Sequence, residues 1–244
     1  RFEYISPLLS LATHRRRRRQ TMINLTIFDW DDTLLSSSFL VRQQHYLPGR
    51  SIKAGSEDRC TVELKKLEEH VFQCLSKALQ FGPVVILTNS EDKWVERSCR
   101  FYLPKVEPLL EKVWIIYAQH LYSHLSPDCT QWKIWAMASL LTNIFKHVSP
   151  SAHKRIVSIG DSNDERVALF SASKYVANAA LISFKLMELP SIEQNNAQLS
   201  YLTKFLDELL TSKCHLDLVY HEGFQQAIST ASYHRLHASS AICR

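Results

Sequence analysis

The sequence predicts an α/β fold of three layers, in which a doubly wound, mostly parallel sheet lies between two layers of helices. Short apolar runs of strand length alternate along the chain with longer segments whose apolar residues recur at helical spacing. Strands that alternate with helices in this way form parallel βαβ units. With 244 residues, of which 45% are hydrophobic, the chain can bury one substantial core.

The positive charge of the chain is concentrated near its start. The net charge is +5, and the run Arg15–Arg19 supplies five positive charges, so the remainder is neutral and has no nucleic-acid signature. We expect residues 1–21 to be a basic flexible arm, 22–212 to be the folded domain and 213–244 to be a loosely structured tail. The arm is open to interpretation as a disordered segment, an organelle-targeting remnant or a nucleic-acid contact. The chain begins with Arg, so whether it is a fragment stays open.

Cysteine usage and hydropathy bear on the compartment. The six cysteines are scattered, with neither a C-x-x-C pair nor metal-ligand spacing, which predicts a reduced, intracellular and cytoplasmic setting. No apolar run approaches the roughly 18 residues that a membrane span needs. We therefore expect no membrane span and no stable nucleic-acid binding, while the oligomeric state cannot be read from the sequence.

The first half of the body is predicted to alternate strands with helices. Gly82 and Pro83 stop one helix, and Ser90 is a plausible N-cap for the next, which ends before Pro104. We expect strands at 23–28, 84–87 and 113–117, helices at 64–81, 91–103 and 108–112, and turns with a short hairpin at 35–57.

The second half continues the alternation. Asp128 with Gln131, and Ser191 with Gln194, have the spacing of capping boxes that open helices. We expect a loop at 118–128, strands at 155–159, 175–176 and 182–186, the last two of which can be one strand or two, and helices at 129–148, 163–171 and 192–209.

Polar clusters follow three of the predicted strands. These clusters are 29–33, 88–90 and 161–165, and the first places three carboxylates within four residues. Unpaired carboxylates are costly to bury, so they should lie where a strand emerges from the core. Since the carboxyl ends of parallel strands share one edge of the sheet, and ligands bind there, the three clusters should meet at one site.

The order of these clusters resembles the four motifs of the haloacid dehalogenase (HAD) superfamily of aspartate-nucleophile phosphohydrolases. The first is Asp29-x-Asp31-x-Thr33-Leu34, the second is Thr88 after an apolar strand, the third is a lysine near a helix start, and the fourth is Gly160-Asp161 with a later acid. The resemblance covers roughly residues 22–210. It implies a Rossmann-like catalytic domain and a Mg²⁺-dependent phosphatase, a hydrolase of phosphate esters.

The resemblance implies a role for each matching residue. Asp29 would be the nucleophile that becomes an aspartyl-phosphate, and Asp31 the general acid and base. Asp31 also separates phosphatases from the dehalogenase members, which lack this second carboxylate. Thr88 would donate to the phosphoryl oxygens, with Thr33 and Asn89 as further substrate-binding residues.

Two lysines compete for the third motif. Lys133 and Lys93 both lie near the start of a predicted helix, where a cation opposes the helix dipole unless it faces an anion. Lys133 is favoured because it lies between the third and fourth predicted strands, where the superfamily carries its lysine. Asp32, by contrast, is interpreted as solvated turn polarity.

Hard carboxylate oxygens gathered at one edge imply magnesium. By resemblance, Asp29 and Asp161 would each contribute a carboxylate oxygen and Asp31 its backbone carbonyl. The chain departs from the commonest fourth motif, because the acid four residues after Asp161 is Glu165 and not aspartate. Glu165 is the preferred match, directly or through water, and Asp164 is the alternative.

No segment is long enough for a large cap domain over the site. Residues 35–57 can hold only a small flap, so the site should be open and suited to a macromolecular phosphorylated substrate such as a phosphoprotein. The alternative function is a catalytically weak or inactive binding or regulatory protein on the same fold, and a phosphotransferase is disfavoured. Substrate identity cannot be read from the sequence.

Overall fold

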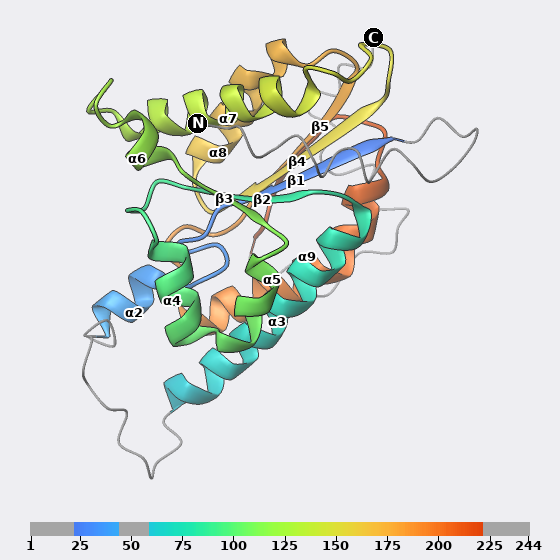
Figure 1. The fold of residues 1–244 in the computed structure, drawn as a ribbon. Coiled ribbons are helices and arrows are strands. Elements are labelled where there is room, and N and C mark those ends of the chain that lie inside the picture. Colours follow the sequence, from blue (N-terminus) through green and yellow to red (C-terminus); the bar gives the residue numbers. More distant parts are fainter. Residues whose placement is uncertain (1–21, 44–58, 222–244) are drawn as a thin grey trace.

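Six parallel strands form the single sheet of the part of the chain described by the computed structural model, residues 22–43 and 59–221 (Figure 1). The strand order is β3-β2-β1-β4-β5-β6, and every neighbouring pair is parallel. The strands are β1 (Ile23–Phe28), β2 (Val84–Thr88), β3 (Trp114–Tyr117), β4 (Lys154–Gly160), β5 (Ala179–Lys185) and β6 (Leu216–Val219). The predicted arm 1–21, most of the predicted flap and the end of the predicted tail lie outside the described residues.

Helices cover both faces of the sheet, which confirms the three-layer, doubly wound α/β prediction. The helices are α2 (Ser37–Arg42), α3 (Arg59–Phe81), α4 (Trp94–Tyr102), α5 (Glu107–Leu110), α6 (Ala118–Tyr122), α7 (Cys129–Phe145), α8 (Asn163–Ala172) and α9 (Ile192–Thr211), with short 3-10 turns η1 (Pro104–Val106) and η2 (Ser173–Tyr175). Figure 1 shows α3, α4, α5 and α9 on one face, and α6, α7 and α8 on the other.

The two hydrophobic cores follow from the alternation of side chains along the central strands. In β1, Leu25 and Ile27 point to the core beneath α7 and α8, while Phe28 points to the core beneath α3 and α9. All seven residues of β4 are buried. Both faces of these strands are covered, and this explains why they read as continuous apolar runs.

The order of the strands creates a switch point at the centre of the sheet. From β1 the chain runs outward through β2 and β3, and then crosses to β4 on the other side of β1. Phe28 is level with Ile86 of β2 and with Ile159 of β4, so these three strands end close together. In open α/β sheets the crevice outside such strand ends is the ligand-binding position.

Several local predictions are wrong. The segment predicted as turns and a hairpin begins with helix α2, and the predicted loop at 118–128 begins with helix α6. The predicted strand at 175–176 does not form, because Tyr175 is the last residue of the 3-10 turn η2 and Val176 is its C-cap. A loose tail from 213 is wrong for 216–219, which form β6; its backbone pairs with β5, and alternate side chains pack against the core.

Helix starts were predicted with mixed success. The capping box of Ser191 and Gln194 at α9 is confirmed. Asp128 caps α7, but its side chain accepts the N–H of Thr130, and no reciprocal bond from Gln131 is formed. The helix predicted to open at Ser90 begins instead at Trp94, after a left-handed Lys93 with φ 64°.

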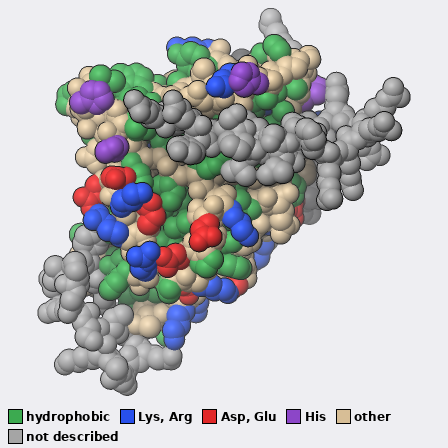
Figure 2. Space-filling model, viewed as in Figure 1, with side chains coloured by type: hydrophobic (Ala, Val, Ile, Leu, Met, Phe, Trp, Pro, Cys, Tyr) green, Lys and Arg blue, Asp and Glu red, His purple; other side chains and the backbone are tan. Residues whose placement is uncertain are grey.

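No large cap domain interrupts the described residues, since the chain between β2 and β3 holds only α4, η1 and α5. Within these residues, no helix has both the length and the apolar character for crossing a membrane. Acidic and basic side chains intermingle on the face shown in Figure 2. Surface ion pairs such as that of Arg100 with Glu107, at 2.7 Å, link neighbouring elements.

Candidate active site

Polar side chains from three strands meet at the carboxyl edge of the sheet. Asp29 follows β1, Thr88 ends β2 and Asp161 follows β4. The backbone N–H of Asp29 donates to the carbonyl of Ile159 at 2.9 Å, which fixes the first carboxylate beside the end of β4. The clusters that the sequence placed at separate strand ends therefore lie at one edge, as parallel topology requires.

Lys133 of α7 lies between two buried carboxylates. Its Nζ is 2.8 Å from Oδ1 of Asp29 and also donates to Oε1 of Glu165, and the three side chains are at most 8% exposed. The alternative, Lys93, is 68% exposed and pairs with Glu96 at 3.4 Å. The fold thus brings Lys133, and not Lys93, to Asp29.

Burial and charge together shift the pKa values of this cluster. Burial raises the pKa of Asp29 well above its ordinary value; the ammonium of Lys133 opposes this, and the carboxylates of Glu165, Asp161 and Asp31 add to it. Burial acts to lower the pKa of Lys133, but the two adjacent carboxylates outweigh it and raise that pKa. Lys133 is therefore a permanent cation beside the predicted nucleophile.

Glu165 of α8 is held on both carboxylate oxygens. Oε1 accepts from Lys133, while Oε2 accepts from the backbone N–H and hydroxyl of Ser162 at 3.0 and 2.8 Å. Ser162 and Glu165 form the capping box of α8. A Cβ on Gly160 would lie 2.5 Å from Cδ and Oε2 of Glu165, so the glycine makes room for this carboxylate.

Three donors surround the carboxylate of Asp31. Oδ2 accepts from Thr88 Oγ1 at 3.4 Å and from the hydroxyl of Ser90, and Oδ1 accepts from the indole N–H of Trp94 at 2.9 Å. Trp94 was not among the predicted site residues. A partly buried indole N–H needs an acceptor, and this was the signal that the sequence offered.

Asp161 is partly buried, and its carboxyl group lies near that of Glu165. Burial raises its pKa to about 7, with a further contribution from Glu165 and an opposing one from Lys133. Thr33 Oγ1 donates to Oδ1 of Asp161 at 3.5 Å, so the predicted substrate-binding threonine contacts the fourth motif. Lys185, which was not predicted, donates from Nζ to the Asp161 backbone carbonyl at 2.9 Å.

Asn89 connects the loop after β2 to the start of α7. Its Nδ2 donates to the carbonyl of Cys129 at 3.1 Å, and its Oδ1 is buried without a hydrogen-bond partner. Next to this contact, Thr130 Oγ1 donates to Oδ1 of Asp164 at 3.0 Å. Asp164 thus pairs with a hydroxyl of α7, whereas Glu165 pairs with Lys133.

Asp32 is not the solvated turn residue that was expected. Its side chain accepts the backbone N–H of Ser38 at 3.0 Å, and only 5% of the residue is exposed. Burial raises its pKa, and the Ser38 hydrogen bonds oppose this. The left-handed backbone of Asp32, with φ 54°, redirects the chain toward α2. The residue therefore shapes the turn between β1 and α2.

The described residues contain no group of three or more His, Cys, Asp or Glu side chains arranged to hold a metal ion. The donor set that remains is two carboxylates, Asp29 and Asp161, with backbone carbonyls of the same loops. Negative charge exceeds positive charge here, because Asp29, Asp161 and Glu165 surround a single buried ammonium. Hard oxygens and excess negative charge fit a magnesium ion that keeps several waters.

A cavity of about 410 Å³ borders Asp31, and Lys133 does not line it. It lies between α2 and the start of α4, and its walls carry hydroxyls, one arginine and one indole. The lining side chains are those of Asp31, Ser37, Ser38, Val41, Arg42, Ser90, Glu91 and Trp94. Of the predicted site residues, only Asp31 lines this cavity.

Lysine, carboxylates and hydroxyls thus lie together at the sheet edge in separate hydrogen-bonded groups. Asp29, Glu165 and Lys133 are joined by ion pairs, and Asp31 and Thr88 by a hydrogen bond. Comparison of the chain with models of known protein families, with curated proteins and with solved structures finds no match.

Proposed function

We propose that this chain is a Mg²⁺-dependent phosphohydrolase of the HAD-like superfamily that works through an aspartyl-phosphate on Asp29. One observation carries the proposal. A buried Asp–Lys pair lies at the switch point of a parallel sheet, with a second carboxylate, Asp31, two residues along the same loop. This arrangement supplies a nucleophile, a fixed cation and a proton carrier for phosphoryl transfer.

In the first proposed step, a carboxylate oxygen of Asp29 attacks phosphorus and the bond to the leaving oxygen breaks. Asp31 gives that oxygen a proton, so the alcohol leaves neutral. In the second step a water attacks phosphorus, Asp31 takes its proton, and the bond from phosphorus to Asp29 breaks. Lys133 and the Thr88 hydroxyl would stabilise the negative charge on the phosphoryl oxygens.

Magnesium, when bound, would neutralise the phosphate and the carboxylates around it. Asp29 and Asp161 would hold it through carboxylate oxygens and Asp31 through its backbone carbonyl. Glu165 would act on Lys133, since both of its oxygens already accept hydrogen bonds from Lys133 and Ser162. It would therefore position the lysine, and its contact with the metal would run through water.

The cavity beside Asp31 supports an assignment for the leaving group. Asp31 protonates the leaving oxygen, so the alcohol part of the substrate should lie on that side, between α2 and Trp94. This cavity is open, and the described residues hold no cap domain over it. The proposed substrate is therefore a phosphorylated side chain on a macromolecule, such as a phosphoprotein.

Replacing Asp29 with Asn tests the proposal. Turnover of a generic aryl phosphate with Mg²⁺ should fall at least about 1,000-fold, because an amide cannot form the covalent intermediate. Circular dichroism and the unfolding midpoint should stay close to those of the wild type. Asp92→Asn, the same change at an exposed position in the nearby loop, should retain activity. An unchanged rate for Asp29→Asn contradicts the mechanism.

A catalytically inactive binding protein on this fold is the second candidate. It is favoured by the occupied oxygens of Glu165, which leave only two carboxylates for a metal. Titration calorimetry with Mg²⁺ separates the candidates. Heat of binding that disappears in Asp161→Asn supports the phosphohydrolase, whereas no binding to the wild type supports the inactive protein.

A further inference from the structure

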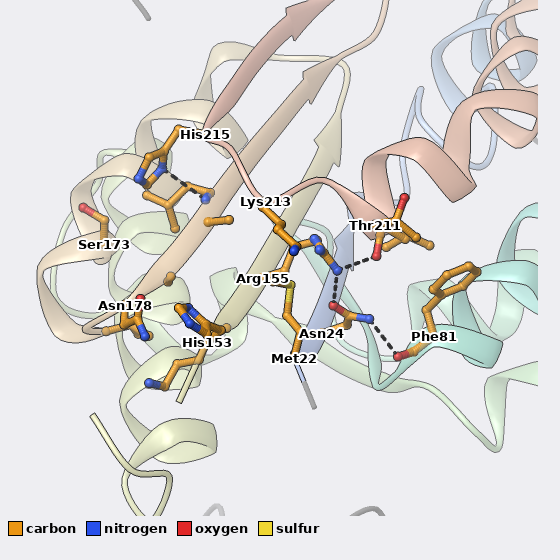
Figure 3. A pocket seen from close by; sticks show the side chains of 16 residues that line it. Met22, Asn24, Phe81, His153, Arg155, Ser173, Asn178, Thr211, Lys213 and His215 are labelled. Carbon is orange, nitrogen blue, oxygen red and sulfur yellow. Dashed lines mark hydrogen bonds between the residues drawn. The ribbon is translucent and has the colours of Figure 1, made fainter. Parts of the chain in front are cut away.

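A second cavity lies at the opposite edge of the sheet from the candidate active site. It has a volume of about 890 Å³ and is built around the amino-terminal ends of β1, β4 and β5 and the segment that leads into β6 (Figure 3). None of the proposed catalytic or metal-binding residues lines it. Its chemistry is therefore independent of the proposed phosphohydrolase.

The lining of this cavity is basic. It includes Lys154, Arg155 and Lys213 together with His153 and His215, and none of the lining residues that the structure describes is Asp or Glu. Lys213 and the two histidines are exposed, whereas Lys154 and Arg155 are buried at 3% and 4% exposure. A cavity with charges of one sign attracts a ligand of the opposite sign.

Arg155 is a buried cation without an acidic partner. Its Nε donates to the carbonyl of Ser212, and its Nη1 donates to Oδ1 of Asn24 at 2.6 Å and to the carbonyl of Leu210. These three hydrogen bonds use Nε and Nη1 and do not involve the third nitrogen, Nη2, and no ion pair between described residues includes the guanidinium. Two N–H donors of Arg155 are left for a ligand.

The buried ammonium of Lys154, the neighbouring residue on β4, is stabilised by hydrogen bonds to backbone carbonyls and by no carboxylate of the described residues. Its Nζ donates to the carbonyls of Ser149, Ala152 and Ala177 at 3.0, 2.9 and 2.9 Å. Removal from water lowers the pKa of both Lys154 and Arg155. Among residues 22–43 and 59–221, neither of these two adjacent buried cations has a counter-ion, which is unfavourable unless an anion completes the site.

His215 adds a directed donor to this cavity. Its Nδ1 accepts the backbone N–H of Leu181 at 3.2 Å, so the ring proton of the neutral form is on Nε2. Phe81 and Leu181 contribute apolar wall beside these polar groups. The volume exceeds what a single inorganic anion fills, and the mixed lining suits an organic molecule with an anionic group.

We infer that this cavity binds a phosphorylated small molecule, with its phosphate on Arg155 Nη2, Lys213 and the two histidines. A planar guanidinium with two free donors matches two phosphate oxygens, and the nearby lysine adds charge. The apolar wall takes the remainder of the molecule. The site lies at the far edge of the sheet from Asp29, so a ligand here would not occupy the reaction centre.

Titration calorimetry with inorganic pyrophosphate, in metal-free buffer at constant ionic strength, tests this site on the full chain. The double variant His153→Gln/Lys213→Gln removes two exposed groups that hold no other element in place. Its affinity should be at least about tenfold weaker, the cost of about one charge-assisted hydrogen bond. Lys112→Gln, an equal charge change at an exposed position outside the cavity, should bind like the wild type.

Thr88→Ala separates this site from the proposed active site, because it removes a hydroxyl at the other edge of the sheet. It should bind pyrophosphate like the wild type, whether or not the chain is a phosphohydrolase. Absence of binding to the wild type overturns the inference. So does equal affinity of the double variant, an equal loss in Lys112→Gln, which would indicate adventitious electrostatics, or a loss in Thr88→Ala.

Discussion

At the scale of single residues, the arrangement of Lys133 explains an unfavourable position in the sequence. A cation near the start of a helix opposes the helix dipole, yet Lys133 lies there because Asp29 and Glu165 face it. Burial of a single one of these charges would be costly, so each of the three residues needs the other two as partners. The proposed chemistry depends on this lysine staying charged and fixed.

Substitution of Gly160 tests whether Glu165 is held against Lys133 and Ser162. In Gly160→Ala the new methyl would overlap the Glu165 carboxyl group, so Glu165 must move away from Lys133 and Ser162. We expect a loss of about 2–4 kcal/mol in the free energy of unfolding, measured by urea denaturation. Phosphatase activity should fall with it.

The double variant Gly160→Ala/Glu165→Asp is the matched control. A shorter acid leaves space for the added methyl, so part of the lost stability should return. If Gly160→Ala alone is as stable as the wild type, Glu165 is not held in the position described here.

At the scale of elements, the start of α4 closes one side of the candidate site. Trp30 donates from Nε1 to Ser98 Oγ at 2.9 Å, and Trp94 donates back to Asp31. One indole of the loop after β1 and one indole of α4 thus each donate a hydrogen bond to the other element. The helix is fixed to the residues that would do the chemistry, although it carries no superfamily motif.

Strand β6 gives a prediction at the same scale. Leu218 packs against the core, whereas Val219, on the opposite face, is 43% exposed. Leu218→Ala should lower the free energy of unfolding by about 1–3 kcal/mol, and Val219→Ala should change it by less than about 0.5 kcal/mol. Chemical denaturation of both variants checks the pair. Equal effects would mean that β6 does not lie in the described register.

At the scale of the whole molecule, the topology concentrates negative charge at one edge and positive charge at the other. The carboxyl edge holds Asp29, Asp161 and Glu165, and the amino edge holds Lys154 and Arg155. Four of these side chains are buried and Asp161 is partly buried. The stability of the fold should therefore depend on pH and on bound ions.

Asp161 sets the sign of one such dependence. Burial raises its pKa from 3.8 to about 7, so between these values the native state keeps a proton that the unfolded state releases. Without metal, stability should fall as pH rises through this window. In Asp161→Asn that fall should be smaller, and the variant should exceed the wild type by at least about 1 kcal/mol above pH 7. Thermal unfolding at several pH values measures both; parallel curves would contradict the prediction.

Much of the fold followed from the sequence, because long periodic segments and buried apolar runs carry strong signals. The central strands were predicted almost to the residue, as was the capping box of α9. Short elements were missed: α2, α6 and β6 are four to six residues long, and packing against the core decides their structure. Local pattern is too weak over such lengths.

By itself, the sequence determined which residues could act together: parallel strands share one edge, so Asp29, Thr88 and Asp161 had to converge. Only the tertiary structure decided between equivalent local patterns. Lys93 and Lys133 both lie near helix starts, and Asp164 and Glu165 both follow the fourth strand. The crossing of α7 over the sheet buries Lys133 against Asp29 and Glu165, while Lys93 stays in solvent. Burial and charge pairing join residues that are far apart in the sequence, so a local sequence pattern cannot predict them.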